Sequence, residues 1–293
     1  PEEFEKICID LTILIEDQDA YRERFARKLN IFDEHHFGNF HQQLGQHLMI
    51  KRREAPANWW PRQKFTENFQ SVRPGPYREI EENYLDEYFS KYIRPDAVVL
   101  DLGCGTGYFT RKIAKATPHV LGLDRTMESA QSACSEVTGT TTPFECDLAD
   151  PNSIIACTDK IKAKFQSLDV ILTNAGIMTP PYKVVDKYKE SLEIQFAVNF
   201  LGHFILINRL MSLVEAAPAG RLALVASEGY TTAPRKTGIA FEDLSFSNGY
   251  DALTAYGHSK LAVMLISQEY SRRLEGTNIT SNSIHPGVIR TNL

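Results

Sequence analysis

The chain has 293 residues, which is enough for one large domain or two small ones with a well-formed hydrophobic core. Apolar residues make up 43% and charged residues 24% of the sequence, as in ordinary soluble globular proteins. The net charge of -5 argues against a nucleic-acid-binding surface, and the short basic run at 51–53 does not reverse it. No apolar stretch approaches the roughly 20 residues of a membrane span, and no signal-peptide pattern opens the chain.

The cysteines are odd in number and scattered along the chain. They are Cys8, Cys104, Cys134, Cys146 and Cys157, and they include no Cys-x-x-Cys pair. This pattern is typical of reduced thiols, so we expect a cytoplasmic protein.

The first 95 residues are predicted to form a mainly helical region without strand alternation. Pro1 and the two glutamates after it favour a helix start, and the apolar residues that follow recur at helical spacing. Histidines and acidic residues crowd the stretch 33–47, but no pair has the His-x-x-x-His spacing that points two imidazoles from one helix face. A solvated helix explains this cluster as well as a ligand set does, and we predict no metal site.

From residue 96 onward, strands and helices alternate. Strands are expected at 98–102, 119–124, 143–147, 168–173, 221–227 and 278–285, and helices at 108–116, 126–137, 152–164, 186–215 and 252–274. This βαβ rhythm predicts an α/β domain over 96–293 with a doubly wound, Rossmann-like parallel sheet, preceded by the helical region 1–95.

The first predicted strand leads into a glycine-rich loop. Asp101, Gly103, Gly105 and Gly107 follow the pattern Asp-x-Gly-x-Gly-x-Gly. With its flanks, over roughly 77–124, this stretch is similar to the first motif of class I S-adenosylmethionine-dependent methyltransferases. A dinucleotide-binding loop must bring backbone N–H groups and a helix N-terminus to a pyrophosphate, whereas S-adenosylmethionine has no phosphate. Aligned on the last two glycines, Asp101 replaces the first glycine of a dinucleotide loop, where a carboxylate would repel a pyrophosphate.

Two carboxylates follow the next strands. Asp124, at the end of the second strand, can accept hydrogen bonds from ribose hydroxyls, and Asp147, after the third, can meet an adenine amino group. Asp124 would repel a 2′-phosphate and so favours NAD over NADP, although Arg125 could offset this repulsion. The alternative role of Asp124 is that of a helix N-cap.

A Tyr-x-x-x-Lys pair, Tyr256 and Lys260, lies in the predicted helix 252–274, with Ser227 and Asn199 upstream of it. Tyrosine has a free pKa of about 10, and an ammonium one helical turn away lowers that pKa by stabilising the phenolate. A serine hydroxyl can hold a substrate oxygen while the tyrosine gives or takes its proton. Together the four residue types favour carbonyl/alcohol redox chemistry.

Several motifs in the same order resemble the short-chain dehydrogenase/reductase family over about 124–293. They are Asn174-Ala175-Gly176 after an apolar strand, Asn199 within 196–204, Ser227 at a strand end, Tyr256 to Ala262, and Ile284 to Thr291. The long gap between Ser227 and Tyr256, which contains Phe241-Glu242-Asp243-Leu244, looks most like the retinol-dehydrogenase-like branch.

The resemblance implies a role for each matched residue. Tyr256 is the general acid/base, Lys260 lowers its pKa and binds the nicotinamide ribose, Ser227 orients the carbonyl, and Asn199 holds a water that links the relay to solvent. Asn174, Ala175 and Gly176 shape the adenosine side, and Pro286, Gly287 and Thr291 line the nicotinamide.

Three function classes remain open on the sequence. An NAD(P)-dependent oxidoreductase that acts on an alcohol or carbonyl small molecule of lipophilic character is favoured by the complete tetrad, with NAD weakly preferred. Methyl transfer from S-adenosylmethionine rests on the glycine motif and its flanking helix. An inactive nucleotide-binding module would explain why neither family pattern is complete.

The family resemblance also bears on assembly and on the chain ends. In that family the helices matching 186–215 and 252–274 pair across subunits, which predicts a homodimer. A substrate-covering segment and a final strand should follow Thr291, and the chain starts at Pro1 rather than Met. We interpret the chain as an excerpt, a truncation or a recombinant joining.

Overall fold

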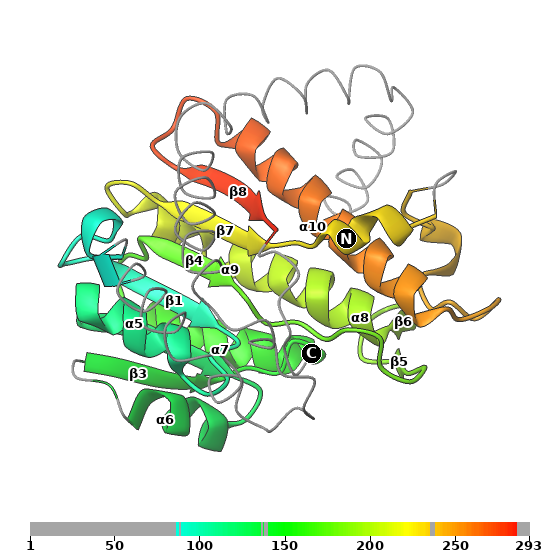
Figure 1. The fold of residues 1–293 in the computed structure, drawn as a ribbon, viewed down its shortest axis with the longest axis horizontal. Coiled ribbons are helices and arrows are strands. Elements are labelled where there is room, and N and C mark those ends of the chain that lie inside the picture. The colour runs from blue at the N-terminus through cyan, green and yellow to red at the C-terminus, as the bar shows by residue number, and fades with distance from the viewer. Residues whose placement is uncertain (1–85, 88, 136, 138–139, 235–237, 286–293) are drawn as a thin grey trace, which may run out of the picture. The chain divides into compact units, whose positions relative to one another are not determined.

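The structure, a computed structural model, describes residues 86–285 apart from 88, 136, 138–139 and 235–237. They form a six-stranded, fully parallel sheet in the order β3-β2-β1-β4-β7-β8 (Figure 1). Its strands are β1 (Val98–Leu102), β2 (His119–Asp124), β3 (Thr140–Glu145), β4 (Val170–Thr173), β7 (Arg221–Val225) and β8 (Thr280–Ile284). This is the strand order of a Rossmann fold, so the predicted fold class is confirmed. Of the helical region predicted over 1–95, residues 1–85 lie outside the described part of the chain.

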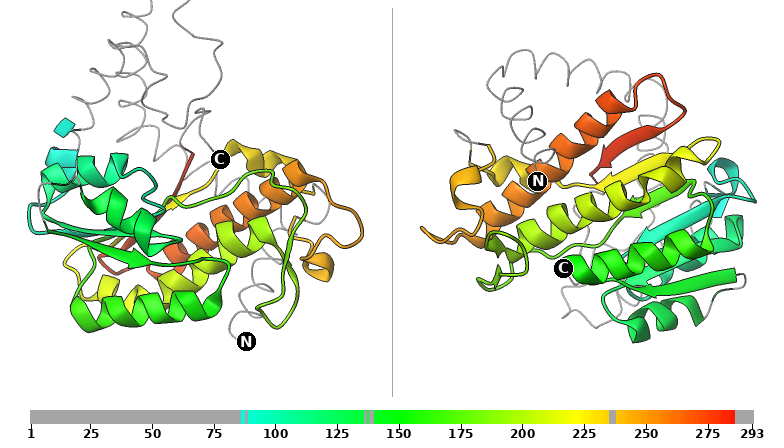
Figure 2. Two further views of the ribbon diagram at one scale, coloured as in Figure 1. Left: turned by 90° about the horizontal axis from the view of Figure 1, so that it is seen from below. Right: turned by 180° about the vertical axis from the view of Figure 1, so that it is seen from behind.

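Helices cover both faces of this sheet. The layer on one face contains α5 (Tyr108–Ala116) and α6 (Met127–Ser135), and the layer on the other contains α7 (Pro151–Lys164), α9 (His203–Glu215) and α10 (Ala252–Arg273) (Figure 2). The predicted bounds of α5, β1 and β2 agree with the structure, and β3 begins three residues earlier than expected. In such a fold ligands bind outside the carboxyl ends of the strands.

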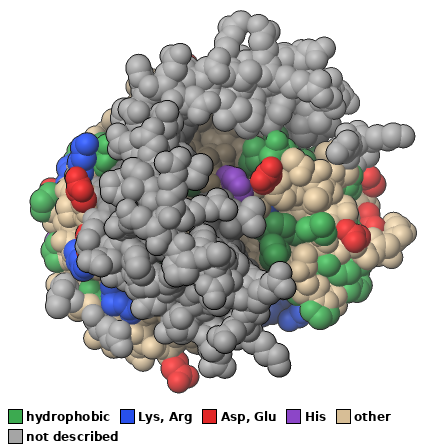
Figure 3. Space-filling view, in the orientation of Figure 1, with side chains coloured by type: hydrophobic (Ala, Val, Ile, Leu, Met, Phe, Trp, Pro, Cys, Tyr) green, Lys and Arg blue, Asp and Glu red, His purple; other side chains and the backbone are tan. Residues whose placement is uncertain are grey.

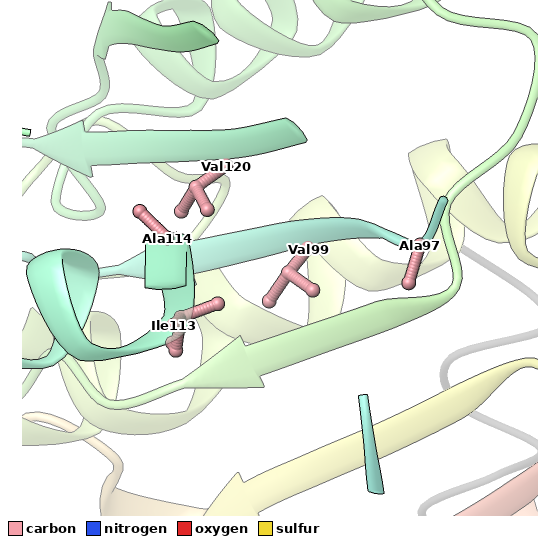
Figure 4. Close-up of a cluster of buried hydrophobic side chains, with 5 residues drawn as sticks. All are labelled: Ala97, Val99, Ile113, Ala114 and Val120. Atoms are coloured by element: carbon pink, nitrogen blue, oxygen red, sulfur yellow. The ribbon is translucent and has the colours of Figure 1, made fainter. Parts of the chain in front are cut away.

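The central strand is buried because it is apolar on both faces. All of β1 except its first residue is buried, as expected for a parallel strand covered by helices on both sides. Ala97 and Val99 pack against Ile113 and Ala114 of α5 and Val120 of β2 (Figure 4). Phe89 and Ile93, from the segment ahead of β1, are partly buried against this cluster.

The long helix predicted over 186–215 begins later than expected, at residue 194. The residues before it form a small antiparallel hairpin of β5 (Val184–Val185) and β6 (Leu192–Glu193). The charged run 186–191 lacks apolar helical spacing, and the buried Glu193 carboxylate accepts hydrogen bonds from the Gln195 and Phe196 amides, which caps the helix start. The helix consists of α8 (Ile194–Phe196), a π-helical turn (Ala197–Gly202) and α9.

This helical segment is also long and apolar enough to cross a membrane. Ile194–Glu215 has 22 residues and contains an 18-residue window with a mean hydropathy of 1.4, contrary to the expectation that no stretch approaches that length. The core helix of a soluble protein meets the same criterion, and 56% of that window is buried inside the structure. It packs against α7, α10 and β4.

The four cysteines in the described part of the chain are free and buried. Cys104 lies in the glycine loop and Cys134 in α6, and the two thiols approach each other over Gly122 of β2. Burial raises the pKa of both thiols. Reduced thiols were predicted for all five cysteines, and Cys8 lies outside the described residues.

The described Lys and Arg side chains are dispersed on the one face of the molecule that Figure 3 draws. In Figure 3 the Lys and Arg side chains of these residues stand apart from one another, among acidic and apolar side chains.

A buried histidine in α10 should make stability depend on pH. His258 Nε2 accepts a hydrogen bond from the Ala240 amide at 2.9 Å, and its ring lies against the rings of Phe196 and Phe246. Burial lowers the pKa of His258 to about 4, whereas in the unfolded chain it is about 6.5. Between these values the unfolded state binds a proton that the folded state does not, so stability falls as the pH drops from about 6.5 to 4.

We therefore expect the melting temperature to decrease more steeply over this acidic range in the wild type than in His258→Gln. Glutamine keeps a hydrogen-bond acceptor for the Ala240 amide but does not titrate. Melting curves recorded between pH 4 and 8 test this, and parallel pH profiles for the two proteins would contradict it.

Candidate active site

The glycine loop runs from the end of β1 to the start of α5. At Gly103 and at Gly107 it requires glycine both for the backbone angle φ and for the lack of space for a Cβ. Gly103 has φ +84° and Gly107 has φ +76°, values that side-chain-bearing residues rarely adopt. A Cβ at Gly103 would lie 2.5 Å from Ala175 Cα, and one at Gly107 would collide with the main chain of Ala133. Gly105 has φ +51° but faces open space, since a Cβ there would meet only Gly103 O at 4.0 Å.

Asp101 lies behind this loop rather than in it. It is the fourth residue of β1 and is 1% exposed, and its Oδ2 accepts a hydrogen bond from Thr110 Oγ1 of α5 at 2.7 Å. Burial raises its pKa to about 6. Asp101 thus lies in the strand predicted over 98–102, and Gly103 is the first residue of the turn that follows it.

Asp124 ties the second strand to the glycine loop. Its Oδ2 accepts a hydrogen bond from the Gly105 amide at 2.9 Å, and its Oδ1 accepts one from the Arg125 amide at 2.7 Å. The alternative role as a helix cap falls to Thr126, whose hydroxyl accepts from the Ser129 amide in the first turn of α6. Asp124 thus lies at the carboxyl edge of the sheet, beside the loop, as predicted.

Asp147 lies two residues beyond β3, on the same edge of the sheet. Its Oδ1 accepts a hydrogen bond from the Ala149 amide at 2.9 Å, and its own amide donates to Ser153 Oγ of α7. These bonds fix the turn between β3 and α7 and leave the carboxylate partly exposed.

The Asn174-Ala175-Gly176 turn after β4 connects the glycine loop with the predicted relay. The Ala175 amide donates to Leu102 O at 2.7 Å, directly before the loop. On its other side, a Cβ at Gly176 would lie 3.5 Å from Asn199 Oδ1 and 3.8 Å from Lys260 Nζ. The predicted adenosine-side turn and two of the predicted relay residues are therefore neighbours.

Asn199 lies in the π-helical turn with its side chain fully buried. Its Oδ1 accepts from the Ile177 amide at 2.9 Å, and its Nδ2 donates to Ile177 O at 2.9 Å and to Ser259 Oγ at 3.0 Å. The side-chain amide is thus occupied in joining the chain after β4 to α10. That Asn199 holds a water stays a prediction.

Tyr256 and Lys260 lie one turn apart on α10, with Lys260 Nζ 5.7 Å from the centre of the Tyr256 ring. Nζ donates a hydrogen bond to Val225 O, at the end of β7, at 2.8 Å. Burial lowers the pKa of Lys260 to about 8, because the ammonium loses hydration that its protein contacts only partly replace.

Ser227 lies two residues beyond β7, where it caps a short 3₁₀ helix (Glu228–Thr232) by accepting from the Gly229 amide at 3.1 Å. A Cβ at Gly229 would lie 2.8 Å from Tyr256 Cε1 and 3.3 Å from Ser227 Oγ. The serine hydroxyl and the tyrosine ring therefore flank the same small space, as the sequence predicted.

The sequence did not predict a role for several residues that support the site. Ile177 and Ser259 anchor Asn199, and Gly229 separates Ser227 from Tyr256. Gly257 lets α10 approach the 3₁₀ helix, because a Cβ there would collide with Thr232 Oγ1. A glycine in a helix interior is an available sequence signal for such an approach. The predicted nicotinamide-lining residues Pro286, Gly287 and Thr291 lie outside the described residues.

Comparison with known proteins agrees with this architecture. A family model described as "Enoyl-(Acyl carrier protein) reductase" matches residues 109–293. Retinol dehydrogenase 14 of Mus musculus is 41% identical over 149 residues, which cover 51% of this chain and 42% of that protein. Retinol dehydrogenase 13 of Homo sapiens is 32% identical over 213 residues, which cover 70% of this chain and 62% of that protein. The chain therefore spans less than two thirds of these curated relatives.

Solved structures share the fold. An uncharacterised protein from Mycobacterium paratuberculosis superposes with a TM-score of 0.58 at 28% identity, covering 70% of this chain and 74% of that one. A provisionally assigned short chain dehydrogenase from Escherichia coli CFT073, complexed with NADPH, gives a TM-score of 0.50 at 21% identity, covering 66% of this chain and 78% of that one.

The parallel sheet, with its glycine loop and polar carboxyl edge, defines a Rossmann-like oxidoreductase fold. The chain belongs to the short-chain dehydrogenase/reductase family, and it is similar to retinol dehydrogenases. The family match begins at Phe109, inside α5, and so follows the glycine loop.

Proposed function

We propose that this protein is an NAD(P)-dependent oxidoreductase that interconverts an alcohol and a carbonyl. The observation that carries the proposal is the convergence of Asn199, Ser227, Tyr256 and Lys260, which come from three separate segments, at the carboxyl edge of β4 and β7. A nicotinamide would supply the hydride chemistry, and these four residues would place and move the proton.

Each side chain has a distinct task in carbonyl reduction. The Tyr256 hydroxyl gives its proton to the substrate oxygen, and Ser227 Oγ donates a hydrogen bond to the same oxygen. The Lys260 ammonium stabilises the resulting phenolate, and its pKa of about 8 leaves it largely protonated at neutral pH. The Asn199 side chain lies beside Gly176 and holds α10 through its hydrogen bond to Ser259, close to Lys260.

Three features of the carboxyl edge of the sheet would contact a bound dinucleotide. The loop residues Gly103, Gly105 and Gly107 would approach the pyrophosphate, with the open side of Gly105 next to the N-terminus of α5. Asp124 would accept hydrogen bonds from ribose hydroxyls and repel a 2′-phosphate, which favours NAD over NADP. Asp147 would meet the adenine.

The names of the relatives support a proposal for the substrate class. Retinol dehydrogenases are named for a lipophilic alcohol, so we propose a lipophilic alcohol or carbonyl small molecule for this chain. Exposed apolar side chains near the relay segments agree with this: Met178 follows the 174–176 turn, and Leu253 lies in the first turn of α10.

Binding of S-adenosylmethionine is a second candidate, favoured by one feature of the loop. The Gly105 amide, which a pyrophosphate would need, already donates to the Asp124 carboxylate, and Asp101 lies buried behind it. Two carboxylates so close to the loop suit a cationic sulfonium ligand better than an anionic pyrophosphate.

Calorimetric titration of the purified chain distinguishes these ligands. We expect NADH to bind more tightly than NADPH, and S-adenosylmethionine and S-adenosylhomocysteine not to bind. In Asp124→Asn, which removes the charge and keeps the side-chain shape, the preference for NADH should become smaller. Binding of the sulfonium compounds alone would overturn the oxidoreductase proposal, and binding of none of the four would indicate an inactive module.

A further inference from the structure

A buried histidine lies beside the relay and is outside the roles described above. His203 follows the π-helical turn as the first residue of α9, and its side chain is 4% exposed. Its Nδ1 lies 2.8 Å from the main-chain oxygen of Asn199. Among the described residues, the charged group that acts on this imidazole is Lys260, on α10.

The π-helical turn explains why a side chain can reach this oxygen. In a regular α-helix the Asn199 carbonyl would accept from the N–H four residues later, which belongs to His203 itself. In this helix the His203 N–H donates to Phe200 O instead. The imidazole of His203 thus supplies at Asn199 O the hydrogen bond that its own main chain no longer makes.

This hydrogen bond fixes the tautomer of the ring. A carbonyl oxygen only accepts, so Nδ1 carries the proton and Nε2 of the neutral ring is an acceptor. Burial lowers the pKa of His203 to about 4, and the Lys260 charge acts in the same direction, so the ring is neutral at physiological pH. Nε2 is buried, and no described residue donates to it. A buried polar atom without a partner is destabilising, so its presence calls for an explanation.

We propose that His203 is a positioning residue of the proton relay, which holds the Asn199 carbonyl through Nδ1–H and offers Nε2 as an acceptor to the proton path beside Lys260. The inference rests on the oxidoreductase function proposed above. It adds a neutral imidazole to the four relay residues. It also gives a reason for the π-helical turn, which leaves the Asn199 carbonyl free to accept the hydrogen bond from His203 Nδ1.

Two substitutions separate this role from packing. Asparagine at 203 keeps an N–H donor near the Nδ1 position but has no acceptor at the Nε2 position, and leucine lacks both. We expect His203→Leu to lower kcat about 10²-fold, as misplacement of catalytic groups does, with the KM for the nicotinamide unchanged. His203→Asn should lower kcat less than His203→Leu, alter the pH profile of kcat and increase the solvent deuterium isotope effect. The control for loss of stability is His258→Gln, which removes a different buried imidazole, on α10.

Nitrogen-15 NMR of the full chain gives a readout that does not depend on turnover. We expect the His203 ring to be the neutral Nδ1–H tautomer at pH 7. An Nε2–H tautomer would overturn the inference. So would folded His203 variants with the kcat, pH profile and isotope effect of the wild type, and in that case the proposed function would stand. A wild type without any nicotinamide-dependent turnover would remove the proposed function and the relay role of His203 with it.

Discussion

Replacing Tyr256 with phenylalanine should lower kcat by about 10²–10⁴-fold, the usual contribution of a positioned general acid. The substitution removes the hydroxyl that gives or takes the proton and keeps the ring that packs against Gly229. We expect the dissociation constant of NADH and the melting temperature to stay at their wild-type values. Steady-state kinetics with a panel of lipophilic alcohols and aldehydes, together with calorimetry, measure these quantities.

Tyr270→Phe is the matched control for this substitution. Tyr270 lies on the same helix and is also buried, and its hydroxyl accepts a hydrogen bond from Asn208 Nδ2, away from the relay. This control should affect stability more than kcat. If Tyr256→Phe retained wild-type turnover, proton transfer would have to come from another group, and the assignment of the relay would be wrong.

Gly103→Ala should destabilise the fold and abolish nucleotide binding. The positive φ of Gly103 costs a side-chain-bearing residue about 1–2 kcal/mol, and the new Cβ would lie 2.5 Å from Ala175 Cα, which belongs to the main chain and cannot rotate away. With an overpacking penalty of about 1–3 kcal/mol added, we expect a loss of several kcal/mol in the free energy of unfolding. Urea denaturation and NADH titration measure the two effects.

Gly105→Ala is the matched comparison, because it has a positive φ but open space at the Cβ position. It should lose only the conformational term, about 1–2 kcal/mol. Equal losses in the two variants would show that close packing on Ala175 contributes nothing, and would contradict the description of the loop given above.

The sequence predicted the sheet well and indicated the four candidate relay residues, because both depend on local patterns; the roles of these residues stay predictions. The apolar run of β1 and the Tyr256/Lys260 spacing are visible within a few residues of sequence. The late start of the helix at Ile194 was missed because its cap is a buried glutamate, Glu193, where an exposed Ser, Thr or Asp is usual.

The tertiary part of the site could not be predicted in this way. The hydrogen bonds from Asn199 reach Ile177 and Ser259, residues 22 and 60 positions away in the sequence, and no local pattern announces such contacts. Similarly, the predicted strand 98–102 already contains Asp101, but no local pattern indicates that its carboxylate accepts a hydrogen bond from Thr110 on α5.

The reactivity of the buried thiols near Gly122 can be used to measure local opening of the structure around the glycine loop. Cys104 and Cys134 are shielded from solvent, and their raised pKa values keep them as unreactive thiols. A thiol reagent can therefore modify them only when the β1–α5 loop separates from α6. The modification rate would then measure how often the carboxyl edge of the sheet opens locally, separately from global unfolding.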